Sequence, residues 1–248
     1  MKTLVVMNEK GGVGKTNIVA HAGWFFAERH RTLVIDLDQQ ANLSATLGAH
    51  LATTHAIELF AGAAQVEPVG PLTVARSTRD LLRAEAGADM AVVEQFRDNL
   101  ASMADDYDVC VIDTPPSLTN RTFGALLAAD AVLAPIGISD YSIQGVTALI
   151  QAIKGVSAHY QRPEPRFLGL LPSIYDRKSR RERELFESLA ETVGKLLFPG
   201  IVAKRDAYAK AASDGEPVWS NKGAAAREAS TEIRGIFEHV AAEMELGA

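Results

Sequence analysis

The 248-residue sequence lacks the features that mark secreted, membrane-spanning or disulfide-bonded proteins. Cys110 is the single cysteine, which excludes an intrachain disulfide and a metal or iron–sulfur site built from several cysteines of one chain. No apolar run approaches the ~18 to 20 residues that span a bilayer. The first residues do not have the layout of a signal peptide, because a short apolar run leads directly into a polar glycine loop. We therefore expect a cytoplasmic protein.

An excess of positive charge is also missing. The formal net charge is −6, so any nucleic-acid site must be a local patch or a product of assembly. Hydrophobic residues make up 47% of the chain, which at this length suffices to bury a full core. We expect one domain that spans residues 1–248.

Short apolar runs alternate with stretches that suit helices. Continuous apolar runs are typical of buried parallel strands, and they occur at residues 4–7, 32–35, 72–75, 109–112, 131–136 and 167–171. The helical stretches are residues 16–29, 89–103, 143–158, 180–196 and 224–244. Residues 49–69 are the least regular, and we expect loops or a short helix there. The alternation predicts an α/β fold with a doubly wound, mostly parallel sheet flanked by helices.

The stretch NEKGGVGKTN, residues 8–17, nearly matches the phosphate-binding pattern G-x-x-x-x-G-K-[ST]. Glu9 stands where the first glycine belongs, although a strand, a glycine loop and a helix follow in the expected order. The composite K-G-G-x-G-K-[ST] should arise by chance with a probability on the order of 10⁻⁵ to 10⁻⁴, which disfavours a simple helix-capping loop. Lys15 would neutralise phosphate oxygens, and the Thr16 hydroxyl would bind Mg²⁺. The predicted nucleotide-binding residues are Lys10, Gly11, Gly12, Val13, Gly14, Lys15, Thr16 and Asn17.

The segment KGGVGKT resembles the deviant Walker A motif of the ParA and MinD class of P-loop ATPases. The resemblance implies an ATP-bound homodimer in which Lys10 reaches across to the nucleotide of the partner subunit. A second cation facing the phosphates would supply transition-state charge as an arginine finger does, and supplying it from the partner would couple hydrolysis to dimerisation. Without the other motifs, a solvated loop lysine would be the preferred interpretation of Lys10.

Two later segments also resemble this class. RTLVIDLDQQANLS places Asp36 and Asp38 at the end of an apolar run, where ligands sit in open α/β sheets. The resemblance makes Asp38 the switch I carboxylate that orients the attacking water near Mg²⁺, and it leaves open a structural role for Asp36 at the strand end. Gln39 stands where the family motif D-x-D-P-Q has proline. YDVCVIDTPPS resembles Walker B followed by switch II, so Asp113 would hold Mg²⁺ through water. The implied catalytic residues are Lys10, Lys15 and Asp38, and the implied metal-binding residues are Thr16, Asp38 and Asp113.

The resemblance to ParA-type DNA-partition ATPases covers nearly the whole chain, including residues 134–153 and 207–219. The early phosphate loop leaves no room for the N-terminal helix-turn-helix arm of larger members, which implies a small form without operator binding. Nitrogenase iron protein, another relative, requires cysteines that bind its cluster, and the single cysteine of this chain excludes it. MinD ends in a basic amphipathic helix, whereas the last 19 residues here carry negative charge, so membrane binding is disfavoured. The acidic residues in question are Glu232, Glu238, Glu243 and Glu245.

Basic residues gather in two places in the C-terminal third. Family members bind duplex DNA without sequence preference through basic residues in corresponding regions, and phosphate contact needs only clustered positive charge. Glu182, Glu184 and Glu187 could instead pair with the arginines on a solvated helix face. Lys204 or Arg205 could instead border the adenine. The predicted DNA-binding residues are Arg177, Lys178, Arg180, Arg181, Lys204, Arg205 and Lys210.

Together, the motifs and the resemblance predict an ATP-driven switch for plasmid or chromosome segregation on the nucleoid. Two subunits would sandwich two ATP–Mg²⁺, pair their basic patches and bind nonspecific double-stranded DNA. Hydrolysis, weak alone and stimulated by a centromere-binding ParB-like protein, would release the DNA. The alternatives are a related positioning ATPase that carries another protein cargo on the nucleoid and, less favoured, a metabolic P-loop ligase.

Overall fold

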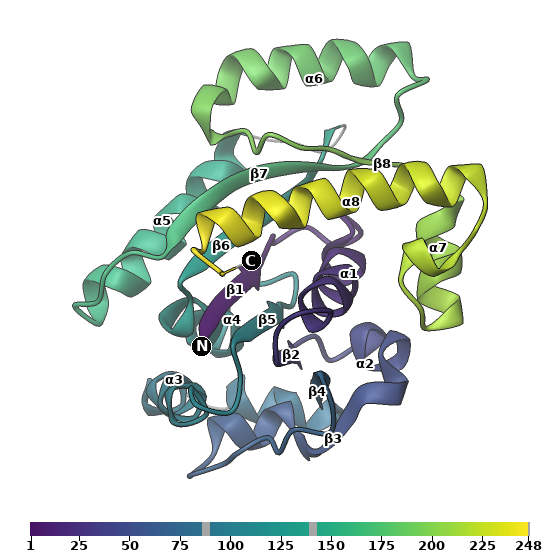
Figure 1. The fold of residues 1–248 in the computed structure, drawn as a ribbon. Coiled ribbons are helices and arrows are strands. Elements are labelled where there is room, and N and C mark those ends of the chain that lie inside the picture. Colours follow the sequence, from purple (N-terminus) through teal and green to yellow (C-terminus); the bar gives the residue numbers. More distant parts are fainter. Residues whose placement is uncertain (86–89, 139–142, 248) are drawn as a thin grey trace.

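A parallel sheet organises the molecule. The structure, a computed structural model, describes residues 1–85, 90–138 and 143–247 (Figure 1). Its eight-stranded sheet has the order β3-β4-β2-β5-β1-β6-β7-β8, and each neighbouring pair of strands is parallel. The strands are β1 (Lys2–Val6), β2 (Thr32–Asp36), β3 (Leu51–His55), β4 (Leu72–Arg76), β5 (Val109–Asp113), β6 (Ala131–Gly137), β7 (Arg166–Tyr175) and β8 (Val202–Ala203). The predicted α/β class is confirmed.

Helices cover both faces of this sheet (Figure 1). One face carries α1 (Lys15–Ala27), α7 (Asp206–Asp214) and α8 (Ala224–Glu243). The other carries α3 (Ala91–Ser102), α4 (Asn120–Ala128) and α5 (Ile143–His159), while α6 (Arg180–Val193) lies at the outer margin, at the top of the view. The shorter helices are α2 (Asn42–Thr46), η1 (Gly48–His50), η2 (Ala56–Phe60), η3 (Arg79–Glu85), η5 (Gly194–Leu196) and η6 (Val218–Ser220).

The central strands are apolar because both of their faces are buried. All five residues of β2 and of β5 are buried. In β1, Val5 packs into the apolar layer under α3 to α5, whereas Leu4 and Val6 pack into the layer under α1 and α8. Successive side chains of a strand point to opposite faces, so a strand between two helical layers needs apolar residues at every position.

Most of the predicted elements coincide with observed ones, and the differences lie at the margins. The prediction of loops or a short helix for residues 49–69 was wrong in part, because β3 lies there next to η2. β3 buries one residue and pairs irregularly with β4, so it lacks a continuous apolar run. β8, α4 and α7 were not predicted. The first residue of the predicted helix 89–103 and residues 139–142 of the segment 134–153 lie outside the described residues.

None of the helices in the described part of the chain combines the length and the apolar character that crossing a bilayer requires.

A buried histidine joins α1 to the segment before α8. His21 is fully buried, and the Val218 N–H donates to its Nε2 over 3.2 Å. Nε2 is therefore the acceptor, so Nδ1 carries the proton and donates to the Asn17 carbonyl over 2.8 Å. The rings of Trp24, Tyr208 and Trp219 surround it edge-on, with centroids 5.1, 5.5 and 5.8 Å away. Burial of this neutral ring lowers the pKa of His21 to about 4.

The lowered pKa of His21 predicts a loss of stability in acid. The unfolded chain takes up a proton near pH 6.5, whereas the folded chain resists it until about pH 4. The contribution of His21 is therefore complete above pH 6.5 and falls by about 3 kcal/mol as the pH drops through this range. Urea unfolding of the wild type and His21→Leu across this range measures it as a difference between the two proteins.

The comparison with His21→Leu is needed because other buried groups act in the opposite direction. Burial raises the pKa of Asp36 to about 6 and that of Asp113 to about 8, so their protonation favours the folded state as the pH falls. These contributions are common to both proteins and cancel in the difference. A difference that stays constant with pH would contradict the assignment of a neutral, buried His21.

Candidate functional site

The glycine loop lies at the carboxyl end of β1, in the middle of the sheet. β1 pairs with β5 on one side and with β6 on the other. The chain builds β2 and β5 on the first side before it crosses to β6, so the loop stands where the direction of winding reverses. Ligands of open α/β sheets bind at such switch points, outside the carboxyl ends of the strands.

The loop backbone requires glycine at two positions. Gly12 has a φ of +76° and Gly14 a φ of +83°, both in the left-handed region that favours glycine. A Cβ added at Gly11 or Gly12 would meet nothing within 4 Å, so the space in front of the loop is open. The N-terminus of α1 has no side-chain cap for its first N–H groups. A loop and helix end of this kind can hold a phosphate group.

Lys15 is folded back into the loop and buried. Its Nζ donates to the carbonyl oxygens of Asn8 and Lys10 at 3.0 and 3.2 Å. Burial lowers the pKa of Lys15, and the nearby carboxylates of Asp113 and Asp38 oppose this shift. Lys10, in contrast, is an exposed residue of the same loop. The two lysines thus occupy different environments within the loop.

Asn8 fixes the loop on the sheet, a role that the sequence did not reveal. Its Nδ2 donates to the carbonyl of Pro135 in β6 over 2.6 Å, and its Oδ1 accepts from the Lys10 N–H over 2.9 Å. The side chain therefore ties the loop after β1 to the neighbouring strand. An asparagine directly after an apolar strand and before a glycine loop was the available signal.

Thr16 and Asp113 meet below the loop. The Thr16 hydroxyl donates to Asp113 Oδ2 over 2.8 Å. Asp113 is fully buried, and this burial, with the charge of Asp36, raises its pKa to about 8. Its second oxygen, Oδ1, is buried and has no hydrogen-bond partner among the described residues.

These oxygen atoms suit Mg²⁺. An unpartnered buried carboxylate oxygen beside a hydroxyl matches the oxygen ligands that Mg²⁺ prefers. Within the described residues no group of three or more His, Cys, Asp or Glu side chains could hold a metal ion. Mg²⁺ usually takes one or two carboxylates and completes its shell with water and substrate phosphates. The predicted residues Thr16 and Asp113 therefore fit this ion.

A chain of hydrogen bonds positions Asp38. Asp36 Oδ1 accepts from the Asp38 N–H over 3.1 Å, and Asp36 Oδ2 accepts from the Ser44 hydroxyl over 2.7 Å. The Ser44 hydroxyl oxygen accepts from the Ser77 N–H over 2.9 Å, and the Ser77 hydroxyl donates to the Asp38 carbonyl over 2.6 Å. Asp36 is fully buried in this ring, which supports the structural role that the sequence left open. Gln39 is exposed at the tip of the loop.

Arg121 joins the two segments that carry Asp38 and Asp113. It is only 4% exposed. Its Nε donates to Glu85 over 2.6 Å, and its Nη1 donates to the Leu37 carbonyl over 2.9 Å. The Leu37 N–H in turn donates to the Asp113 carbonyl over 3.0 Å. Sequence reasoning missed Arg121, although an arginine at the start of an apolar helix was a usable signal.

A pocket of about 250 Å³ lies beside the loop. Asn17 Oδ1 and Arg205 Nε are buried without a hydrogen-bond partner in the described part of the chain. Ile174 has a φ of +56°, which a β-branched residue rarely adopts and which is typical of strained functional segments. Lys204 and Arg205, either of which was predicted as a possible neighbour of the adenine, both line this pocket. Its lining includes Gly14, Asn17, Ile174, Lys204, Arg205 and Tyr208.

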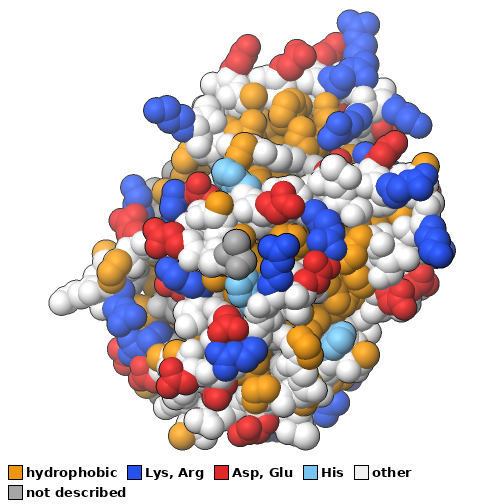
Figure 2. Space-filling model, in the orientation of Figure 1, with side chains coloured by type: hydrophobic (Ala, Val, Ile, Leu, Met, Phe, Trp, Pro, Cys, Tyr) orange, Lys and Arg blue, Asp and Glu red, His pale blue; other side chains and the backbone are white. Residues whose placement is uncertain are grey.

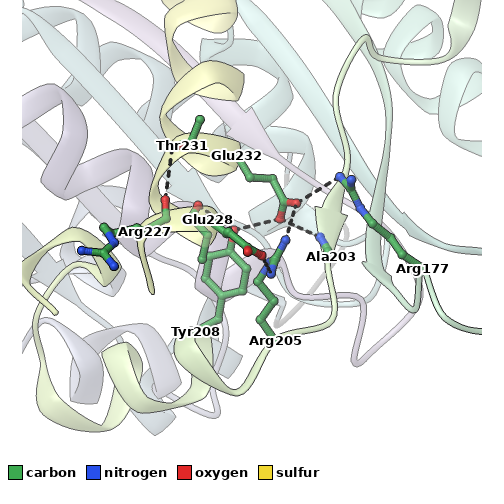
Figure 3. Close-up of polar contacts among 9 residues, drawn as sticks. Arg177, Ala203, Arg205, Tyr208, Arg227, Glu228, Thr231 and Glu232 are labelled. Carbon is green, nitrogen blue, oxygen red and sulfur yellow. Dashed lines mark hydrogen bonds and ion pairs between the residues drawn. The ribbon is translucent and has the colours of Figure 1, made fainter. Parts of the chain in front are cut away.

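The predicted DNA-binding residues lie on α6, α7 and the loops before them, and two of them, Lys204 and Arg205, line the pocket beside the phosphate loop. Over α6, at the top of the view, Figure 2 shows acidic side chains among the basic ones. Arg180 pairs with Glu184 at 2.8 Å, one of the pairings that the sequence left open. Arg177 and Arg205 instead meet Glu232 of α8 (Figure 3). Among the described residues no ion pair is found for Lys178, Arg181, Lys204 and Lys210.

Removing the Ser77 hydroxyl should slow ATP hydrolysis more than it weakens ATP binding. Ser77→Ala deletes the hydrogen bond that fixes the Asp38 carbonyl and leaves the loop and Lys15 intact. The resemblance implies that Asp38 orients the attacking water, and misplacing such a group should lower kcat by roughly three- to tenfold. Steady-state kinetics together with ATP titration separates the two effects. Ser102→Ala, which removes a hydroxyl bond at the end of α3, is the control. Equal losses of kcat and ATP affinity would count against this positioning role.

The sequence is similar to a known protein family and to several characterised proteins. A family model described as an AAA domain matches residues 1–164. The chain is 38% identical to protein IncC of Escherichia coli over 259 residues, covering 99% of this chain and 71% of that protein. It is 30% identical to the chromosome-partitioning ATPase Soj of Thermus thermophilus, covering 88% of this chain and 87% of the relative.

Solved structures share the fold. Apo McdA from Cyanothece has a TM-score of 0.81 at 21% identity and covers 97% of this chain and 99% of its own. Cobyrinic acid a,c-diamide synthase from Mycobacterium smegmatis, with bound ADP and magnesium, has a TM-score of 0.77 at 25% identity, covering 100% of this chain and 96% of that one. The glycine loop, the carboxylates beneath it and the similarity to IncC and Soj agree, and the chain belongs to the family of ParA-type partition ATPases.

Proposed function

We propose that this chain is an ATP-driven switch that dimerises with ATP, binds duplex DNA without sequence preference and releases it on hydrolysis. In this proposal residues 1–248 act as one unit, and a centromere-binding ParB-like protein stimulates hydrolysis during plasmid or chromosome segregation. The different environments of the two loop lysines carry the proposal. Lys15 is buried, and its ammonium is held by two carbonyl groups of its own loop, whereas Lys10 is exposed. An exposed cation at this position can serve a second nucleotide across a dimer interface.

The residues below the loop supply the hydrolytic site. Lys15 neutralises phosphate charge, and the N–H groups of the loop bind phosphate oxygens. Thr16, Asp113 and Asp38 would hold Mg²⁺, which would supply further positive charge for phosphoryl transfer. Asp38 Oδ1 accepts from the Gln40 N–H over 3.0 Å, whereas no hydrogen bond to Oδ2 is found among the described residues. The proposal assigns the attacking water to Oδ2.

The pocket beside Gly14 is suited to the nucleotide base. It opens next to the loop, and its lining residues include Asn17 and Arg205, each of which has one buried polar atom without a hydrogen-bond partner among the described residues. A planar heterocycle could fill such a space. This arrangement favours a contact between Arg205 and the base over a direct contact between Arg205 and DNA, because the Arg205 side chain is only 20% exposed. Lys178, Arg181 and Lys210, which are exposed, are better placed for phosphate contacts.

A metabolic ligase is the second candidate, because a solved cobyrinic acid a,c-diamide synthase shares the fold at 25% identity. Such an enzyme would turn over ATP with a small molecule and would need neither DNA nor a partner. A positioning ATPase for another protein cargo would share the DNA-coupled behaviour of the leading proposal, so its partner alone would distinguish it.

The proposal is tested by DNA binding in three nucleotide states. Fluorescence anisotropy with a nonspecific duplex is measured with ATP–Mg²⁺, with ADP–Mg²⁺ and without nucleotide, over a series of salt concentrations. We expect tight, salt-sensitive binding with ATP alone. No binding in any state, despite ATP-induced dimers, would contradict the proposal and leave the ligase or a protein cargo.

Replacing Lys10 should impair stimulated hydrolysis more than nucleotide binding. Lys10→Ala keeps Lys15, Thr16 and the loop glycines, so ATP should still bind with an affinity within about threefold of the wild type, because removing an interaction made only in the transition state leaves ground-state binding unchanged. Loss of transition-state charge should lower DNA- and partner-stimulated turnover at least about a hundredfold. Lys154→Ala, on the exposed side of α5, is the matched control. Equal loss of ATP binding and turnover would count against a role across the dimer.

A further inference from the structure

One nearly buried carboxylate connects the base pocket to the basic surface. Glu232 lies on α8, and its side chain is only 9% exposed. Its Oε1 accepts from the Ala203 N–H over 2.8 Å and lies 3.1 Å from the Tyr208 hydroxyl (Figure 3). Two contacts to the same oxygen fix the carboxylate against β8 and α7. A buried carboxylate with such partners is held rigidly, because leaving them unpaired would be costly.

The other oxygen of Glu232 faces two arginines. Arg177, from the loop after β7, places Nη2 3.2 Å from Oε2, and Arg205 places Nη2 3.6 Å from the same atom. Arg205 also pairs with Glu228 at 2.7 Å (Figure 3). Arg177 has no further ion pair in the described part of the chain, and its side chain is 58% exposed. Glu232 therefore holds a solvent-facing arginine that was predicted to contact DNA.

Residues that contact Glu232 also form part of the pocket lining. Ala203, Arg205 and Tyr208 all line the pocket beside Gly14. A rearrangement of β8 or α7 around a bound nucleotide would therefore move the carboxylate or change its partners. Arg177 would feel this change directly, because its described ion pair is with that carboxylate. The two predicted surfaces thus share one group, as a coupling of two sites through packed contacts requires.

We propose that Glu232 is a latch that withholds Arg177 from DNA in the nucleotide-free chain and releases it when the base pocket is filled. This inference rests on the function proposed above. A carboxylate paired with Arg177 cancels its charge and competes with a phosphate for the same guanidinium. Because Arg177 is half exposed, the ion pair is weak enough to exchange with a phosphate, while the buried Glu232 stays anchored. Linkage requires the converse effect, so bound DNA should also favour ATP.

Replacing the latch carboxylate should raise DNA binding without nucleotide. Glu232→Gln keeps an oxygen for the Ala203 N–H and the Tyr208 hydroxyl but removes the charge that holds Arg177. We expect nucleotide-free affinity for a nonspecific duplex to rise about three- to tenfold, with a salt slope steeper by about one per added phosphate contact. Affinity with ATP–Mg²⁺ should change less, so the ratio of the two affinities falls. Anisotropy measures both, and thermal melting confirms that the variant is folded.

Two further variants separate the latch from a general effect of charge. Glu228→Gln changes the net charge by the same amount and lies one turn away on α8, but Glu228 contacts Arg205 and not Arg177. The gain expected for Glu232→Gln should be absent there, and it should disappear in the double variant Glu232→Gln with Arg177→Gln. Arg177→Gln alone replaces an exposed side chain and should weaken ATP-dependent binding more than nucleotide-free binding. This variant tests the latch even if Glu232→Gln does not fold.

The outcomes separate the latch from the function on which it rests. ATP-dependent DNA binding by the wild type, with no nucleotide-free gain in folded Glu232→Gln, would overturn the latch alone. Equal gains in Glu232→Gln and Glu228→Gln would overturn it as well, because charge alone would then explain the change. A wild type that binds no DNA with ATP would overturn both the proposed function and the latch.

Discussion

Burial of charge beneath the phosphate loop is the constraint on which the rest of this site depends. Asp36 and Asp113 are fully buried next to each other at the ends of β2 and β5, and Lys15 is nearly so. Desolvation of an isolated carboxylate is costly, so each must find donors or a cation. Asp36 finds them in Ser44 and in the Asp38 backbone, while Asp113 has Thr16 on one oxygen and no partner on the other. The carboxylate with the unsatisfied oxygen is the one that suits Mg²⁺, and the satisfied one holds the loop of Asp38.

The same logic extends outward to the basic surface. The chain is acidic overall, and carboxylates of α8 neutralise two of the arginines that were predicted to contact DNA. The positive surface is therefore smaller in this state than the sequence suggests. A binding face whose charge depends on internal ion pairs can be strengthened by a local rearrangement, whereas a face of free lysines cannot. This dependence suits the proposed function, in which the affinity for DNA changes with the nucleotide state.

The sequence revealed the features that depend on local pattern. The glycine loop and Asp113 follow apolar runs directly, Asp38 lies three residues beyond one, and Thr16 follows the glycine loop. Burial on both faces makes central strands such as β2 easy to recognise. The structure reveals what depends on distant partners. Ser77 reaches Asp38 across 39 positions, Arg121 reaches Leu37 across 84, and Glu232 reaches Ala203 across 29, and no periodicity connects such residues. The edge strands β3 and β8 were missed because they bury few residues and carry only a short pattern.

The central claim is that the two loop lysines serve different subunits, and a mixing experiment tests it directly. A Lys10→Ala subunit has an otherwise intact site that lacks the lysine of its partner, and an Asp38→Ala subunit supplies Lys10 but cannot orient water. Each variant alone should be nearly inactive in DNA- and partner-stimulated ATP hydrolysis. Random pairing in an equimolar mixture should restore roughly a quarter of the wild-type rate, because each mixed dimer of a two-fold assembly has one complete site. A mixture no more active than its separate components would contradict the account.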